Sequence, residues 1–158
     1  MFFSPIDQII MIIKTIGLCA DHAGFALKEH VKSVLKAKGL VCKDYGTCSE
    51  TSCDYPDFAH AMAKGMEQGE VFPAIAICST GNGIAMTLNK HQGIRAALCW
   101  NVELASLARL HNNANILVMP GRFISNEEAE KIVETFLTGS FEGGRHQGRI
   151  DKIPLTSK

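Results

Sequence analysis

The sequence predicts a single-domain three-layer α/β/α sandwich, in which helices cover both faces of a five-stranded parallel sheet. Apolar runs rich in β-branched residues alternate with amphipathic stretches five times, a pattern typical of strands joined by crossover helices. The run Val71–Cys78 is apolar throughout, as expected for a strand that is buried on both faces of a parallel sheet. The length of 158 residues suits one domain.

The first half of the chain supplies three strands and two helices of this alternation. The predicted elements are the strands 12–20, 40–45 and 71–78 and the helices 24–38 and 57–68. Gly39 and Gly69 end the two helices, because glycine is favoured just past a helix C-terminus. Asp57 is an N-cap candidate for the second helix. A turn-rich segment through Pro56 precedes it.

The second half continues the pattern and completes the sheet. It contains a short helix after residue 78, the strands 94–99 and 115–119, and the helices 102–111 and 126–137. Together the elements predict a Rossmann- or flavodoxin-like sheet with right-handed crossovers. Ligands of such sheets bind at the carboxyl ends of the strands, so we expect the chemistry in the segments that follow the strands.

Charge and cysteine content restrict the possible partners and the compartment. The 16 basic and 16 acidic residues cancel, which gives no electrostatic reason to expect nucleic acid or a membrane. The apolar run Ile9–Ile13 is too short to span a membrane. The six cysteines form no Cys-x-x-Cys pair, which predicts reduced thiols and a cytoplasmic protein. We assign residues 1–13 to an N-terminal extension and residues 14–158 to the single domain.

Two loops after predicted strands carry reactive side chains. Asp21 and His22 follow the first strand and could bind hydroxyl groups or transfer protons; alternatively, Asp21 caps the next helix and His22 is solvated. Cys78-Ser79-Thr80-Gly81-Asn82-Gly83 follows the third strand, and its glycines allow main-chain N–H groups to close on an anion at a helix N-terminus. A cysteine base beside such donors suits a carbon-acid reaction through an enediolate.

Other interpretations of the glycine loop are weaker. A dinucleotide-binding fingerprint would need a third glycine where Met86 stands, and would follow the first strand. A cysteine phosphatase loop would need an arginine where Ile84 stands. A tight turn with a buried cysteine remains the structural alternative.

Basic residues of the second half form a candidate set for an anion. His111 ends a predicted helix and is either a general acid–base group near neutral pH or a C-terminal cap. Arg145 and Arg149 share one face if they are helical and could hold a phosphate, although solvated arginines are the ordinary alternative. Arg122, after the fifth strand, could add a third cation. No His, Asp or Glu residues have metal-ligand spacing, so we expect no metal and no other cofactor.

These motifs, in this order, resemble the ribose-5-phosphate isomerase B family, within the wider group that includes galactose-6-phosphate isomerase. The resemblance runs from about Lys14 to Ile150. Its markers are Asp21-His22-Ala23-Gly24, Asp54-Tyr55-Pro56, Cys78 to Gly83, Asn89-Lys90, Gly93-Ile94-Arg95-Ala96, His111 to Asn115 and Glu142-Gly143-Gly144-Arg145-His146. The resemblance implies interconversion of ribose 5-phosphate and ribulose 5-phosphate in the pentose phosphate pathway.

The resemblance also implies residue roles. Cys78 is the base that moves a proton between C1 and C2, Thr80 supports the relay, and His111 opens the furanose ring. Some members carry a serine and a glutamate instead, but Ile84 and Ala85 after the loop indicate the cysteine type. The implied substrate-binding residues are Asp21, His22, Tyr55, Ser79, Gly81, Asn82, Gly83, Asn112, Arg122, Arg145 and Arg149. Among these, the implied phosphate ligands are His22, Arg122, Arg145 and Arg149.

The family is dimeric or tetrameric, which implies a homodimer or homotetramer whose sites are shared between subunits. Two other functions remain open. A six-carbon sugar phosphate, allose or galactose 6-phosphate, could be the substrate, although one chain with the full catalytic set favours the ribose enzyme. A nucleotide-binding regulatory module would explain the glycine loop but not His111 or the C-terminal arginines.

Overall fold

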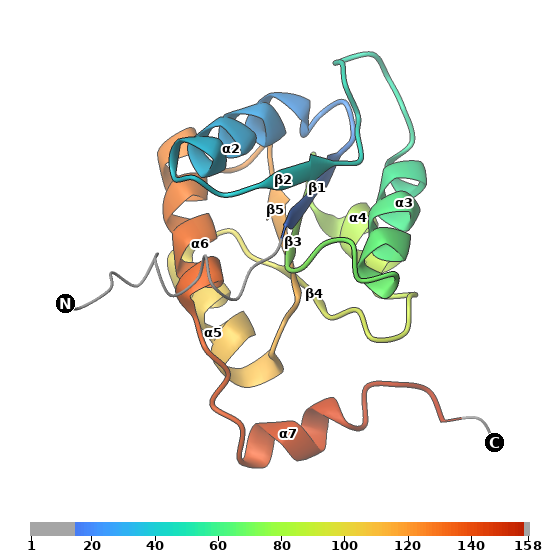
Figure 1. Cartoon of the computed structure of the whole chain (residues 1–158), viewed down its shortest axis with the longest axis vertical. Coiled ribbons are helices and arrows are strands. Elements are labelled where there is room, and N and C mark those ends of the chain that lie inside the picture. Colours follow the sequence, from blue (N-terminus) through green and yellow to red (C-terminus); the bar gives the residue numbers. More distant parts are fainter. Residues whose placement is uncertain (1–14, 157–158) are drawn as a thin grey trace.

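The computed structural model, which describes residues 15–156, has one five-stranded sheet with the strand order β2-β1-β3-β5-β4 (Figure 1). All neighbouring strands are parallel. The strands are β1 (Ile16–Ala20), β2 (Cys42–Asp44), β3 (Ala74–Cys78), β4 (Ala96–Leu98) and β5 (Ile116–Pro120). The parallel sheet between helices confirms the predicted fold class.

Helices cover both faces of the sheet and form two separate apolar cores. The helices α2 (Phe25–Ala37), α5 (Val102–Asn112) and α6 (Asn126–Thr138) pack on one face. The other face is covered by α3 (Tyr55–Glu67) and α4 (Asn82–Leu88). Figure 1 shows these groups on opposite sides of the strands.

The three central strands are the most deeply buried part of the molecule. Every residue of β1, β3 and β5 is buried, and each fully buried aliphatic side chain contributes about 1.5–3 kcal/mol. The strand expected from Val71 begins at Ala74, because Pro73 has no N–H to donate to a sheet. The apolar run is therefore a central strand only over its last five residues.

Several other predicted element boundaries also differ from the structure. The strand predicted over 40–45 is limited to Cys42–Asp44, and the strand predicted over 94–99 is limited to Ala96–Leu98. Helix α3 begins at Tyr55 and includes Pro56 in its first turn, where a missing N–H costs nothing. Asp57 is consequently not the N-cap but an acidic residue of the first turn, which the helix dipole favours. The strand expected from Ile12 is described from Ile16. Residues 12–14 of that strand, and the expected extension 1–13, lie outside the described residues.

Helices α5 and α6 begin where the sequence predicts, and each has a side-chain cap. Asn101 accepts a hydrogen bond from the N–H of Leu104 at 2.9 Å. Ser125 and Glu128 form a reciprocal capping box at the start of α6. These caps fix the helices that lead into and away from β5.

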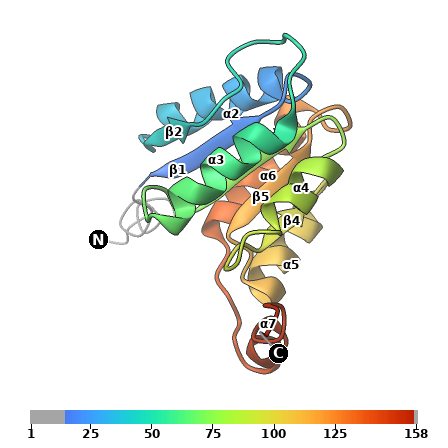
Figure 2. The ribbon, with the colours of Figure 1, turned by 90° about the vertical axis from the view of Figure 1, so that its right-hand side faces the viewer.

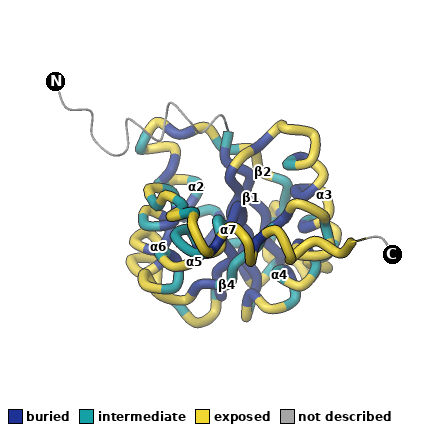
Figure 3. Tube along the Cα trace, turned by 90° about the horizontal axis from the view of Figure 1, so that it is seen from below, coloured by how far each residue is buried: buried dark blue, intermediate teal, exposed yellow. Residues whose placement is uncertain are grey.

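The C-terminal helix α7 (Arg145–Ile150) is short and lies beyond the end of α5, away from the body of the sandwich (Figure 2). Residues 139–144 connect it to α6, and the chain after α7 is exposed through residue 156 (Figure 3). We call residues 139–156 the C-terminal arm. Within residues 15–156, no helix combines the length and apolar character needed to cross a membrane.

Candidate active site

The loops after β1, β3 and β5 meet at the carboxyl edge of the sheet. The N–H of Asp21 donates to the carbonyl of Ile77 at 3.3 Å. The N–H groups of Gly121 and Arg122 donate to the carbonyls of Cys78 and Ser79 at 2.9 and 3.1 Å. Main-chain hydrogen bonds therefore fix three of the predicted site segments to one another.

The Cys78 side chain lies inside the glycine loop. Its thiol is almost fully buried, and the N–H of Gly81 donates to its Sγ at 3.2 Å. Gly81 has φ +78°, and a Cβ there would overlap the side chain of Leu98, so only glycine fits this turn. The Cys78 sulfur therefore has a main-chain hydrogen-bond donor aimed at it. Burial raises the pKa of another thiol, that of Cys99 after β4, to about 12.

Polar side chains on the same loop are accessible to a ligand. Thr80 and Asn82 are exposed, Ser79 is half-buried, and the N–H of Asn82 donates to Thr80 Oγ1 at 3.2 Å. The ring of Tyr55, from the start of α3, lies so close to Gly83 that a Cβ on this glycine would overlap it. Tyr55 therefore forms one wall beside the loop.

The loop after β1 contributes an acid and an imidazole to this edge. Asp21 is buried, and its Oδ1 accepts a hydrogen bond from the N–H of Gly24 at 3.0 Å. The predicted capping role of Asp21 is thus present. His22 Nδ1 accepts from the N–H of Cys53 at 3.2 Å, so the neutral ring carries its proton on Nε2. The contact between His22 and Cys53 had no sequence signal.

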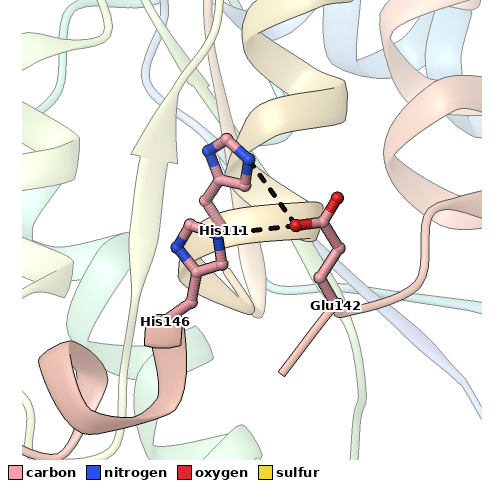
Figure 4. Close-up of side chains that lie close together, drawn as sticks. All are labelled: His111, Glu142 and His146. Atoms are coloured by element: carbon pink, nitrogen blue, oxygen red, sulfur yellow. Dashed lines mark ion pairs between the residues drawn. The ribbon is translucent and has the colours of Figure 1, made fainter. Parts of the chain in front are cut away.

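The second group of predicted residues lies at the amino edge. His111 is in the last turn of α5, and its ring stacks on that of His146, with centroids 4.2 Å apart and planes at 12°. Glu142 Oε2 lies 3.4 Å from His146 Nε2 and 3.9 Å from His111 Nε2 (Figure 4). Burial lowers the pKa of His146, as do the charges of His111 and Arg145, against the opposing effect of Glu142. His146 is therefore neutral at neutral pH.

His111, Glu142 and His146 are also of the residue types that bind zinc, and their ligand atoms lie within 4.8 Å of one another. Sequence spacing missed this group because folding alone brings the arm to α5. An ion bound by both imidazoles has to lie near both ring planes. Two nearly parallel planes about 4 Å apart do not meet near the rings, so the arrangement suits a shared carboxylate better than a metal ion.

One chain does not bring all the predicted site residues together. Cys78 pairs with Pro120 at the end of β5, whereas His111 precedes the start of that strand. The five residues of β5 span about 13 Å. The carboxyl edge holds Asp21, His22, Tyr55, Cys78, Ser79, Thr80, Gly81, Asn82, Gly83 and Arg122. The amino edge holds His111 and Asn112, at the end of α5, and Arg145 and Arg149, in α7. Figure 2 shows α7 beyond the end of α5.

Two residues that sequence reasoning did not assign, Glu142 and His146, lie directly beside His111. Both belong to the last marker motif, Glu142 to His146, on either side of a glycine pair. That motif was the available signal. The spacing of Arg145 and Arg149 predicts phosphate recognition, whereas contact with a distant histidine cannot be predicted from spacing.

Comparison with known proteins gives consistent matches. A family model described as Ribose/Galactose Isomerase matches residues 16–153. Ribose-5-phosphate isomerase B of Escherichia coli (strain K12) is 40 % identical over 141 residues, or 89 % of this chain and 95 % of that protein. A crystal structure of a ribose 5-phosphate isomerase from Thermotoga maritima has a TM-score of 0.87 at 50 % identity, covering 88 % of this chain and 96 % of that one.

A structure of ribose-5-phosphate isomerase B from Mycoplasma genitalium, with bound ribulose-5-phosphate, is also similar. Its TM-score is 0.83 at 43 % identity, and the match covers 88 % of this chain and 93 % of that one. The similarity thus spans nearly the whole length of each of these proteins. It includes both edges of the sheet, because residues 16–153 contain Cys78 as well as His111 and the arginines of α7.

Proposed function

The chain belongs to the ribose/galactose isomerase family and is an isomerase of the intramolecular oxidoreductase class, and from that premise we propose that it interconverts ribose 5-phosphate and ribulose 5-phosphate through an enediolate. The observation that carries this proposal is the Cys78 thiol, held by the Gly81 N–H in a glycine loop at the ligand-binding edge. The relative with bound ribulose-5-phosphate supports the substrate class.

Cys78 is the base of this reaction. In the direction from ribose 5-phosphate to ribulose 5-phosphate, its thiolate removes the proton from C2, and a hydrogen-bond donor stabilises the C1 carbonyl oxygen. The main-chain N–H groups of residues 81–83 stabilise the negative oxygen of the enediolate, a contribution that is usually large. The thiol then returns this proton to C1, while the C2 hydroxyl loses its own proton to the C1 oxygen and becomes the ketone. Thr80, which is exposed on the same glycine loop as Cys78, supports the proton relay.

The complete site forms between two chains. His111, Asn112, Arg145 and Arg149 lie about 13 Å of strand away from Cys78 in one chain, too far to reach the same small substrate. A second copy with two-fold symmetry supplies this set to the Cys78 of its partner, and the exchange is reciprocal. We therefore propose a homodimer or homotetramer in which each site contains residues of two subunits.

The phosphate of the substrate is bound by cations from both chains in this arrangement. His22 and Arg122 come from the carboxyl edge, and Arg145 and Arg149 come from the partner's α7. Asn112 contacts a sugar hydroxyl, and His111 opens the furanose ring. We further propose that residues 14–158 form the isomerase domain and that the protein works in the cytoplasm; its six free cysteines are consistent with a reducing compartment.

The deciding experiment is an isomerase assay of the purified chain in the presence of a metal chelator. We expect conversion of ribose 5-phosphate to ribulose 5-phosphate, with allose 6-phosphate and galactose 6-phosphate as comparison substrates. Faster turnover of a six-carbon phosphate would reassign the substrate. The absence of turnover on all three, together with a nucleotide that co-purifies, would contradict the isomerase proposal and favour a regulatory module.

A further inference from the structure

The C-terminal arm is attached to the end of α5 directly beside His111. The N–H of Glu142 donates to the carbonyl of Leu110, the residue before His111, at 3.0 Å. Arg109 Nε donates to the carbonyl of Gly139 at 3.3 Å. Because main-chain atoms make the first contact, the position of Glu142 relative to His111 does not depend on a flexible side chain alone.

Two consecutive glycines then turn the chain back towards His111. Gly143 and Gly144 have φ values of +69° and +58°, which ordinary L-residues rarely adopt. This turn starts α7 so that the ring of His146 packs face to face against His111, with 7 % of His146 exposed. The glycine pair therefore places a second imidazole against His111, which Glu142 already adjoins (Figure 4).

We propose that Glu142 and His146 are positioning residues for His111 in the ring-opening step. The proposal rests on the role of His111 given above. His111 donates a proton to the ring oxygen as the bond from C1 to that oxygen breaks, and the anomeric hydroxyl becomes the carbonyl after losing its proton to water. The ring orientation of His111 decides whether this proton reaches its acceptor.

Each of the two residues makes a separate contribution. The Glu142 carboxylate, 3.9 Å from His111 Nε2, limits rotation of the His111 ring. His146 supplies a flat surface below that ring. Its lowered pKa keeps it neutral, so the stack does not place two imidazolium charges together. A carboxylate, an oriented imidazole and a neutral support thus form one unit at the end of α5.

The first test compares Glu142→Gln with Glu130→Gln. Glu130 pairs with His30 at 2.8 Å on α6 and α2, so the control removes a carboxylate from another half-buried histidine. For Glu142→Gln we expect roughly a 10-fold or greater loss of kcat on ribose 5-phosphate, which is within the contribution of ~10²–10⁴-fold from general acid–base catalysis. KM and deuterium exchange into ribulose 5-phosphate, which needs no ring opening, should change less than about twofold. Glu142→Asp should recover part of the loss, and Glu130→Gln should leave all three values unchanged.

The second test is a double-variant cycle with His111→Asn. If Glu142 acts through His111, then Glu142→Gln adds no further loss once His111 is replaced. Losses that multiply, or full activity of Glu142→Gln, would overturn the proposal. The cycle also separates this proposal from the ring-opening role of His111. If His111→Asn reduces isomerisation of ribose 5-phosphate and deuterium exchange into ribulose 5-phosphate equally, the ring-opening role is wrong. The cycle still reports in that case whether Glu142 acts through His111. His146→Phe keeps a flat ring and should retain more kcat than His146→Ala.

Discussion

The two edges of the sheet hold their reactive residues in different ways. At the carboxyl edge, Cys78 ends a fully buried central strand, and main-chain hydrogen bonds connect its loop to the loops on both sides. At the amino edge, His111 ends an amphipathic helix and is supported by an arm that projects from the body. The carboxyl edge is complete as a scaffold within one chain, whereas the amino edge presents its residues outward.

The attachment of the arm explains this contrast. Two hydrogen bonds attach its base: Arg109 Nε donates to the carbonyl of Gly139, and the N–H of Glu142 donates to the carbonyl of Leu110. Beside it, a groove of about 550 Å³ separates α7 and the following residues from the loop 89–95. The arm is thus held at its base and leaves apolar side chains such as Ile153 exposed. An arm of this kind suits contact with a second copy of the chain.

The largest effect should come from the carboxyl edge. Cys78→Ala removes the proposed base with little change in volume, so we expect a loss of kcat of at least ~10²–10⁴-fold with folding intact. Cys99→Ala is the matched control, because Cys99 is also buried at the end of a strand but has no assigned role. Near-normal turnover of Cys78→Ala in an isomerase assay would remove this residue from the mechanism.

A mixing experiment tests whether the two edges work together across subunits. Cys78→Ala and His111→Ala should each be inactive alone, yet a mixed dimer contains one site that carries neither substitution. Refolding the two variants together should therefore restore up to about half the activity per mixed dimer. If tagged subunits exchange and no activity returns, both residues serve one site within one chain, and the two-subunit site is wrong.

The same contrast explains what could be predicted from the sequence. Motifs such as Cys78 to Gly83 follow strands directly, so strand prediction alone placed them at the carboxyl edge. The contact of Glu142 and His146 with His111 depends on the tertiary position of the arm, which cannot be predicted from the spacing of these residues. Lys28 was also missed: it is 1 % exposed on the amphipathic helix α2 and donates to Asp44 at 2.6 Å. Nothing in the local pattern of α2 distinguishes this lysine from a solvated one.

A smaller effect should follow from changes at α7. Arg145→Ala and Arg149→Ala each remove a proposed charge-assisted hydrogen bond to phosphate, and such a bond is worth roughly 1.5–3 kcal/mol. We expect KM for ribose 5-phosphate to rise about 10- to 100-fold while kcat falls less. Lys152→Ala removes an exposed cation just past α7 and should leave KM unchanged. Unchanged KM in both arginine variants would identify them as ordinary surface residues.

The smallest effect should come from Gly148→Ala, which asks whether the face of α7 is open or covered. Arg145, Gly148 and Arg149 share one helical face, and a Cβ on Gly148 meets no atom within 4 Å in one chain. On an open helix this change would be stabilising by up to about 1 kcal/mol. If the face meets the partner's site, the added methyl group lies in the contact and costs about 1 kcal/mol, the low end of overpacking. We therefore expect KM to rise about fivefold. An unchanged KM with a raised Tm would show that this face stays open in the working enzyme, so that Arg145 and Arg149 would have to reach phosphate in some other way.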